Sequence, residues 1–261
     1  MTRAVAAFRW TIRLVVSAAA AGALFAQPAI AQRKTVAVLA FDNYTGKPDY
    51  DPLGKGVASM MISDLSSVPE IQLVERERTQ DLVKEMDLQH SKYFDSTTAV
   101  KAGHLVGAQY VVVGAFNAID PKIRIDTRVV RVETGEIVKT AHVTGDQDKF
   151  FDLEQTLSDR LIDGLGVALS PEDKQRLASQ QRANRIDALS TMLGFSQALA
   201  LFDRGDYLGA AERMAPVVQA SPNSALLRVS LAEMRHRATA ASTEKAKDKL
   251  KSGLRGLIHK P

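Results

Sequence analysis

The sequence contains no cysteine. Without cysteine the protein forms no disulfide, so its folded state must depend on a buried core. A lipid also cannot be attached through a cysteine at the mature amino terminus. Long hydrophobic runs are scarce as well: the uncharged apolar stretch from Leu14 to Ala26 has 13 residues, whereas about 20 are needed to cross the hydrocarbon of a bilayer as a helix.

The first 31 residues have the pattern of a secretory signal peptide. Arg3, Arg9 and Arg13 form a basic start, the apolar run follows, and Ala29-Ile30-Ala31 has the small-x-small pattern of a signal peptidase site. We therefore expect export, with Gln32 as the mature amino terminus. The alternative is an uncleaved membrane anchor.

Net charge is low once this leader is set aside. The remaining chain has 31 basic and 30 acidic side chains, a net charge of +1, which gives no reason to expect a nucleic-acid partner. The charges are nevertheless unevenly divided, because residues 32–165 carry a net charge of −5 and residues 166–261 a net charge of +6. This contrast predicts two modules with different surfaces.

Hydrophobic periodicity predicts a mixture of strands and helices up to residue 166. We expect strands at 35–41, 71–74, 108–116, 122–133 and 136–144, and helices at 54–67, 75–89, 96–106 and 150–166. Ser96 or Thr97 should cap the third helix, Gly107 should end it, and Gly135 should take the positive φ of a tight hairpin. This order predicts an α/β fold, a mixed sheet with flanking helices.

After residue 173 the pattern is helical only, and residues 191–224 resemble a tetratricopeptide repeat of 34 residues. The residues on the repeat's pattern are Ala198, Leu201, Gly205, Tyr207, Ala210 and Pro222, while Gly194 and Met214 depart from it. If the repeat is present, Phe195, Leu199 and Phe202 on its first helix are candidates for a groove that binds a partner protein. Packing in the core is the alternative for these side chains.

The loop before the first helix has the outline of a phosphate-binding turn without its key residues. Asp49 stands where such a loop needs a glycine before Gly54-Lys55, and Gly56 supplies no hydroxyl for magnesium. We interpret the loop as a connector and a protein contact surface.

Other chemistry-bearing residues also lack the spacing of a site. The carboxylates Asp42, Asp49 and Asp51 do not follow a calcium loop, and Ser196 lies within a helical pattern instead of a strand-to-helix elbow. The five histidines form no i, i+4 pair; they are His90, His104, His142, His236 and His259. We expect no enzyme activity, no cofactor and no metal.

The carboxyl-terminal stretch 243–261 is a basic amphipathic helix, with Ala246, Leu250 and Leu254 four residues apart. One interpretation is a capping helix packed on the repeat. The other is a segment that makes peripheral contact with an anionic membrane or an acidic partner.

Four stretches in order resemble the curli secretion component (CsgG-type) family over roughly residues 35–165. They are VAVLAFDNYTG, GKGVASMMISDLSSVPEIQLVERERTQDLVKEMDLQ, AVKAGHLVGAQYVVVGAF and RVVRVETGEIV. The resemblance implies an α/β periplasmic domain, related in fold to the amino-terminal domain of the Tol-Pal propeller protein (TolB), with a role in envelope transport or assembly. The predicted plan is a signal peptide (1–31), a CsgG-like domain (32–166), a helical linker (167–190) and a TPR-like region with a basic carboxyl-terminal helix (191–261).

Two departures limit what the resemblance implies. The family's secretion channel is a lipoprotein, and this chain has no cysteine to carry the lipid. That channel also inserts long membrane hairpins into the fold, whereas only NAIDPK separates Phe116 from Ile123 here. We therefore expect no transmembrane pore of the chain's own.

The sequence supports two hypotheses for function. The preferred one is a non-enzymatic exported protein, periplasmic or associated with the outer membrane, that acts as an interaction or assembly factor with envelope proteins in transport or biogenesis. The alternative is a homo-oligomeric, ring-forming subunit of a curli-like secretion assembly whose pore is supplied by another protein.

Overall fold

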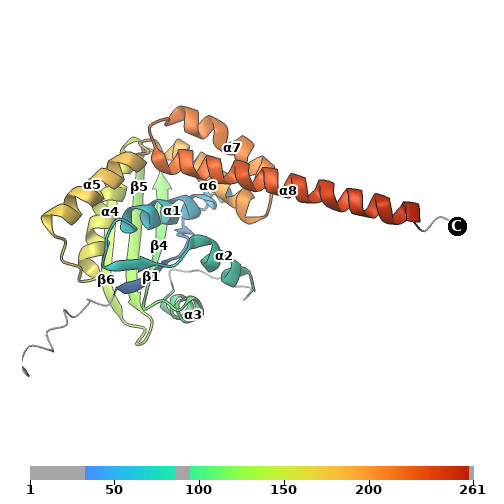
Figure 1. Ribbon diagram of the computed structural model, residues 1–261. Helices are drawn as coiled ribbons and strands as arrows, with labels where there is room; N and C mark the ends of the chain where they lie inside the picture. Colours follow the sequence, from blue (N-terminus) through green and yellow to red (C-terminus); the bar gives the residue numbers. More distant parts are fainter. Residues whose placement is uncertain (1–32, 86–94, 259–261) are drawn as a thin grey trace, which may run out of the picture. The chain divides into compact units, whose positions relative to one another are not determined.

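The computed structural model of the protein describes residues 33–85 and 95–258 (Figure 1). Arg33–Pro261 forms one compact unit. The predicted signal peptide lies outside the described residues. The division of the rest into domain, linker and repeat stays a prediction.

The predicted strands and helices are present, with ends that differ by a few residues. The strands are β1 (Lys34–Val38), β2 (Asp42–Asn43), β3 (Ile71–Leu73), β4 (Tyr110–Ile119), β5 (Lys122–Arg131) and β6 (Ile137–Asp146). The helices are α1 (Leu53–Leu65), α2 (Arg76–Glu85), α3 (Ser96–Val106), α4 (Phe150–Gly164), α5 (Pro171–Asn184), α6 (Leu189–Asp203), α7 (Tyr207–Ala220) and α8 (Ala225–Ile258). Two short 3-10 helices, η1 (Pro48–Tyr50) and η3 (Gln147–Lys149), precede α1 and α4.

The sheet is mixed, as predicted. Its strand order is β3-β1-β4-β5-β6, and β2 pairs with β4 further along the same edge as β1. Strands β1, β3 and β4 are parallel, whereas β4, β5 and β6 form an antiparallel meander. Helices separate the parallel strands in the sequence because parallel neighbours need a crossover connection.

Successive side chains of a strand point to opposite faces of the sheet, so the apolar residues of β1 and β4 lie in two separate cores. Val36 and Val112 contribute to the larger core with α1, α4, α6 and α7, whereas Ala37 and Val111 contribute to a smaller core under α3. The same period of two exposes Arg124 and leaves Asp126 and Arg128 half-buried, so the predicted wet face of β5 is confirmed.

Glycines and one aspartate set the ends of several elements. Gly107 ends α3 with φ 70° and Gly135 turns between β5 and β6 with φ 72°, both as predicted. The cap of α3 was predicted wrongly: the Asp95 carboxylate, one residue earlier, accepts a hydrogen bond from the backbone N–H of Thr98 at 3.0 Å. Strand β4 also continues to Ile119, so the turn to β5 is only two residues long.

The carboxyl-terminal helices pack on the α/β part through α6, which lies against α1. Helices α6 and α7 form a hairpin around Gly205, whose φ is 80°, and the first part of α8 packs on α7. That this hairpin is a tetratricopeptide repeat stays a prediction. None of the helices in the described ranges combines the length and the apolar character needed to cross a membrane.

Candidate functional site

The Gly-Lys-Gly stretch lies in the first turns of α1, where its glycines allow close packing. A Cβ on Gly54 would stand 1.9 Å from the carbonyl oxygen of Phe41, and a Cβ on Gly56 would stand 2.0 Å from the Oγ of Ser196. Gly54 therefore lets the backbone between β1 and β2 approach α1, and Gly56 lets α6 approach it. Ser196 is itself buried and donates a hydrogen bond to the Met192 carbonyl at 2.7 Å.

The lysine of the same stretch forms an ion cluster with α6 and α2. Lys55 Nζ lies 2.5 Å from Asp203 Oδ2, and Arg76 Nη1 lies 2.7 Å from Asp203 Oδ1. Burial acts to raise the pKa of Asp203, but Arg76 and Lys55 outweigh it and hold the pKa below its ordinary value. The cluster fixes the end of α6 against α1 and α2.

The loop carboxylates and the described histidines are not gathered into one site. Asp51 accepts a hydrogen bond from Asn43 Nδ2 at 2.7 Å, which closes the loop between β2 and α1. His104, His142 and His236 are exposed on three different elements, α3, β6 and α8. His90 and His259 lie outside the described residues.

The three candidate groove residues do not share one environment. Phe195 has 0% and Leu199 5% of its surface exposed, and both belong to the larger core. Phe202 is half-buried and meets Tyr207 edge-to-face, with ring centroids 5.1 Å apart. The burial of Phe195 and Leu199 matches the core-packing alternative, and a partner groove at these residues stays a prediction.

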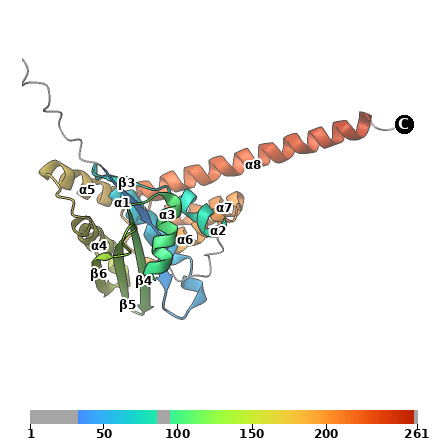
Figure 2. The same cartoon turned by 90° about the horizontal axis from the view of Figure 1, so that it is seen from below.

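Helix α8 changes character along its length. Leu227, Leu231 and Met234 are buried, but every residue from Ser242 to Lys251 is exposed. Both views show this part of α8 running beyond the other helices (Figures 1 and 2). The expectation that the tail packs on the repeat is therefore wrong for these residues, because α7 is already covered by the first turns of α8.

Two acidic side chains are buried together where α1, α4 and α5 meet. Asp64 and Glu154 each have 0% of their surface exposed and lie close enough for each to shift the pKa of the other. Burial raises the pKa of Asp64 to about 6, against the effect of a hydrogen bond from Asn184 Nδ2 at 3.2 Å. Burial and the Asp64 charge raise the pKa of Glu154 well above its ordinary range. Such a pair is compatible with burial when the two carboxyl groups share a proton.

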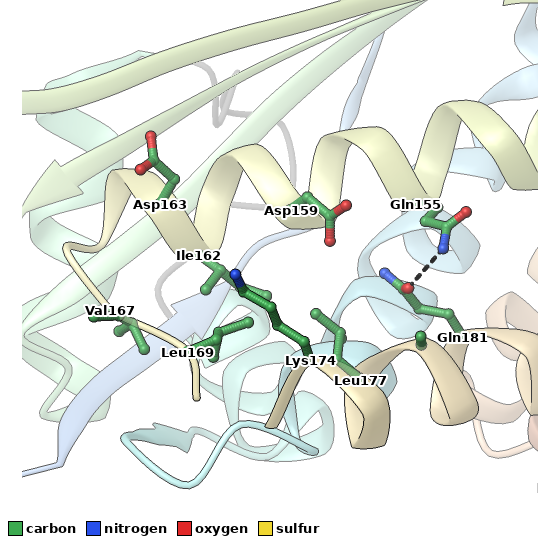
Figure 3. A pocket seen from close by; sticks show the side chains of 11 residues that line it. Gln155, Asp159, Ile162, Asp163, Val167, Leu169, Lys174, Leu177 and Gln181 are labelled. Carbon is green, nitrogen blue, oxygen red and sulfur yellow. Dashed lines mark hydrogen bonds between the residues drawn. The ribbon is translucent and has the colours of Figure 1, made fainter. Parts of the chain in front are cut away.

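A cavity of about 620 Å³ lies beside this pair, between α4 and α5. Figure 3 shows Asp159 on α4 and Lys174 and Gln181 on α5 at the cavity, with Asp163 pointing away. Gln155 Nε2 donates to Gln181 Oε1 at 3.0 Å. The rest of the wall is largely aliphatic; it includes Ile162, Val167, Ala168, Leu169, Leu177 and Ala178. Its size falls within the usual range for ligand sites.

Comparison with known proteins identifies one matching family model. The model described as "Curli production assembly/transport component CsgG" matches residues 17–124. This match supports a CsgG-type domain in the first part of the chain. The predicted continuation of the likeness to residue 165 lies outside the matched range.

A curated relative is similar over a longer part of the chain. "Putative adenylate cyclase 3" of Rhizobium meliloti (strain 1021) is 22% identical over 205 residues, which cover 78% of this chain and 33% of that protein. The chain thus spans about a third of the length of this relative. The name of a protein of which the match covers only 33%, at this identity, assigns no activity to the chain.

Several solved structures share part of the arrangement. The LpoB C-terminal domain from Escherichia coli is 17% identical, covering 46% of this chain and 87% of that one, with a TM-score of 0.37. TolB from Acinetobacter baumannii is 12% identical over 51% of this chain and 28% of its own, with a TM-score of 0.36. The PelC dodecamer from Paraburkholderia phytofirmans in space group P6 is 16% identical over 53% of this chain and 91% of its own, with a TM-score of 0.32.

Proposed function

We propose that the protein is a non-enzymatic, exported interaction factor that serves the assembly of, or transport through, the cell envelope. The observation that carries this proposal is the exposed half of α8. A helix gains most of its stability in proteins from packing one face against a neighbour, yet every residue from 242 to 251 is exposed. A partner that covers this helix would supply the missing contacts.

The composition of this segment indicates the kind of contact. It contains Lys245, Lys247, Lys249 and Lys251 against Glu244 and Asp248, and Leu250 is 67% exposed. A basic helix with an exposed leucine suits an acidic protein surface or an anionic membrane. The match to a family described as an assembly and transport component supports an envelope setting for this contact.

Site-specific photo-crosslinking in cells that make the full chain tests the proposal. The crosslinker replaces Leu250, and the matched control replaces Val229, which is 68% exposed on the packed part of the same helix. We expect an adduct with an envelope protein or lipid from position 250 and none from position 229. Equal labelling at both positions, or adducts only with cytoplasmic proteins, would contradict the proposal.

The second candidate is the ring-forming subunit of a secretion assembly. Strand β6 favours it, because this ten-residue strand pairs only with β5 among the described strands and leaves an open edge to the sheet. Light scattering after gel filtration distinguishes the candidates: a ring has several times the mass of one chain, and an adaptor has the mass of one. In a ring, the adduct at position 250 could also join two copies.

The proposed absence of enzyme activity has a direct check. The name of the curated relative suggests an adenylate cyclase assay, so the purified chain is incubated with ATP and a divalent cation. We expect no cyclic AMP above the level of a heat-denatured sample. Production of cyclic AMP would overturn the non-enzymatic assignment while leaving the contact made by α8 to be tested separately.

A further inference from the structure

Gln181 is a buried polar side chain that lacks a partner for its donor. It is 1% exposed, and its Oε1 accepts from Gln155, but its Nε2 has no acceptor within hydrogen-bonding geometry. Figure 3 shows this nitrogen turned toward Asp159 across the cavity. A buried donor left in this state is unfavourable, so an acceptor entering the cavity would be favoured.

Two charged residues at the rim of the same cavity, Asp159 and Lys174, are exposed to solvent. The Asp159 carboxylate and the Lys174 ammonium group form no ion pair with any residue in the ranges the structure describes. Burial raises the pKa of Asp159, and the nearby Gln181 amide partly offsets this effect. The cavity thus presents one amide donor, one carboxylate acceptor and one cation.

The remaining wall would suit a branched aliphatic side chain. Ile162 and Leu177 are 3% exposed and Val167 is 9% exposed, and Leu169 packs against the same core. These side chains come from α4, the following loop and α5, so the apolar wall is continuous across the connection between the helices. Burial of one leucine side chain against this wall would favour binding.

We propose that this cavity between α4 and α5 binds an extended peptide segment of a partner protein, with one aliphatic side chain against Ile162, Val167, Leu169 and Leu177. A peptide group has both an acceptor for Gln181 Nε2 and a donor for Asp159, and a carboxylate on the segment would pair with Lys174. The inference deepens the proposed interaction function and rests on it, because it names a second contact with a partner.

The test uses the full chain with isotope-labelled Ile, Leu and Val methyl groups and the blocked peptide acetyl-Gly-Leu-Gly-amide as the probe. We expect the probe to shift the methyl signals of Ile162, Val167 and Leu177 and to leave Val229 unchanged, with a dissociation constant on the order of 0.1–1 mM. The matching peptide with Lys in place of Leu should bind at least tenfold more weakly. Absence of shifts, or equal binding of the two peptides, would overturn the site.

One variant separates a binding role of Gln181 from a structural role. Gln181→Leu removes the unpartnered donor at similar volume and also removes the acceptor of Gln155 Nε2, so the melting temperature should change little while the probe binds about tenfold more weakly. The control is Asp163→Asn on the same helix as Asp159, because its side chain points away from the cavity and pairs with Lys139 at 2.7 Å. A large fall in melting temperature with unchanged probe affinity would show that Gln181 is structural only.

Failure of this site and failure of the proposed function give different results. If the peptide does not shift the cavity methyl groups but position 250 still crosslinks to an envelope component, only the cavity inference is wrong. If neither occurs, the interaction function is also contradicted.

Discussion

The two ends of α1 hold buried carboxylates in opposite electrostatic settings. Near the first turn, Asp203 of α6 lies between the cations Lys55 and Arg76. Near the last turn, Asp64 faces another acid, Glu154 of α4. Both carboxylates are at least 96% buried, yet the pKa of Asp203 is lowered and that of Asp64 is raised.

The difference shows how one helix holds two parts of the chain by different means. At its first turn, opposite charges hold α6, and this attachment persists as long as Asp203 is ionised. At its last turn, Asn184 of α5 donates hydrogen bonds to Ser63 Oγ at 2.9 Å and to Asp64 Oδ1. Burial raises the pKa of Asp64 to about 6 there, so this is the end of α1 that we expect to respond to pH near 6.

The largest effect is expected from removing the carboxylate of the ion cluster. Asp203→Ala would leave Arg76, whose side chain is 9% exposed, without its buried partner and paired only with the exposed Glu77 carboxylate at 2.9 Å. Breaking a buried pair in this way costs about 3–5 kcal/mol. Urea denaturation followed by circular dichroism should show this loss in the free energy of unfolding.

A surface pair and a fully apolar replacement provide the controls for the cluster. Asp163→Asn removes the exposed pair with Lys139 and should cost less than about 1 kcal/mol. The triple variant Lys55→Met, Arg76→Met and Asp203→Leu should recover most of the stability lost in Asp203→Ala, because no buried charge remains. A loss below about 1 kcal/mol for Asp203→Ala would mean that the cluster does not hold α6.

Ionisation of Asp64 at the last turn of α1 is expected to lower the stability of the fold, whereas ionised Asp203 at the first turn raises it. Because the folded-state pKa of Asp64 is about 6, above its ordinary value of 3.8, the folded state binds more protons than the unfolded state between these pH values. Stability attributable to Asp64 should therefore fall as the pH rises from about 4 to about 6, by up to about 3 kcal/mol.

The variant Asp64→Asn tests this sign. Its amide can donate to Glu154 without a charge of its own, so the free energy of unfolding at pH 7 should rise by about 1–3 kcal/mol and fall less steeply between pH 4 and 6. Glu154 still titrates in the variant, so some pH dependence will remain. Denaturation curves at half-unit pH steps provide the measurement. A variant less stable than the wild type at pH 7 would show that ionised Asp64 is favourable.

The packing at the first turn can be tested without changing any charge. Gly56→Ala places a Cβ 2.0 Å from Ser196 Oγ and 2.9 Å from Met192 Sδ. Alanine favours the helix by about 1 kcal/mol over glycine, but the clash should outweigh this and give a net loss of about 1–2 kcal/mol. Adding Ser196→Gly should restore part of the loss in a double-mutant cycle of thermal unfolding, and purely additive losses would place the clash elsewhere.

The sequence predicted the elements of this fold better than its contacts. Strands and turns give local signals in the sequence. Examples are the alternating apolar residues Ile123, Ile125 and Val129 of β5 and the helix-ending Gly107. The partners Lys55 and Asp203 are 148 residues apart, and no local pattern brings them together. One local signal did point to a contact. Asp64 interrupts the apolar face of the helix predicted over 54–67, and an acid buried there needs a partner.

The candidate groove residues also show that a local pattern does not determine what a side chain contacts. An apolar stripe on a helix is required both for a partner groove and for core packing, so periodicity alone could not separate the two for Phe195 and Leu199. Both residues are buried in the larger core, and α6 approaches α1 closely at Gly56. The glycine was visible in the sequence, but its contact with α6 was not.

The smallest effect is expected at the start of α5, the helix that carries Asn184 to the acid pair. Ser170 and Asp173 form a capping box: the Asp173 N–H donates to Ser170 Oγ at 3.1 Å, and the Ser170 N–H donates to Asp173 Oδ2 at 3.2 Å. Ser170→Ala should cost about 1 kcal/mol, whereas Ser170→Thr, which keeps the hydroxyl, should cost much less. If hydrogen exchange of α5 rises in the Ala variant while that of α6 does not, α5 is held to α1 independently of the ion cluster at the other end; equal increases in both helices would mean that the two attachments form one cooperative unit.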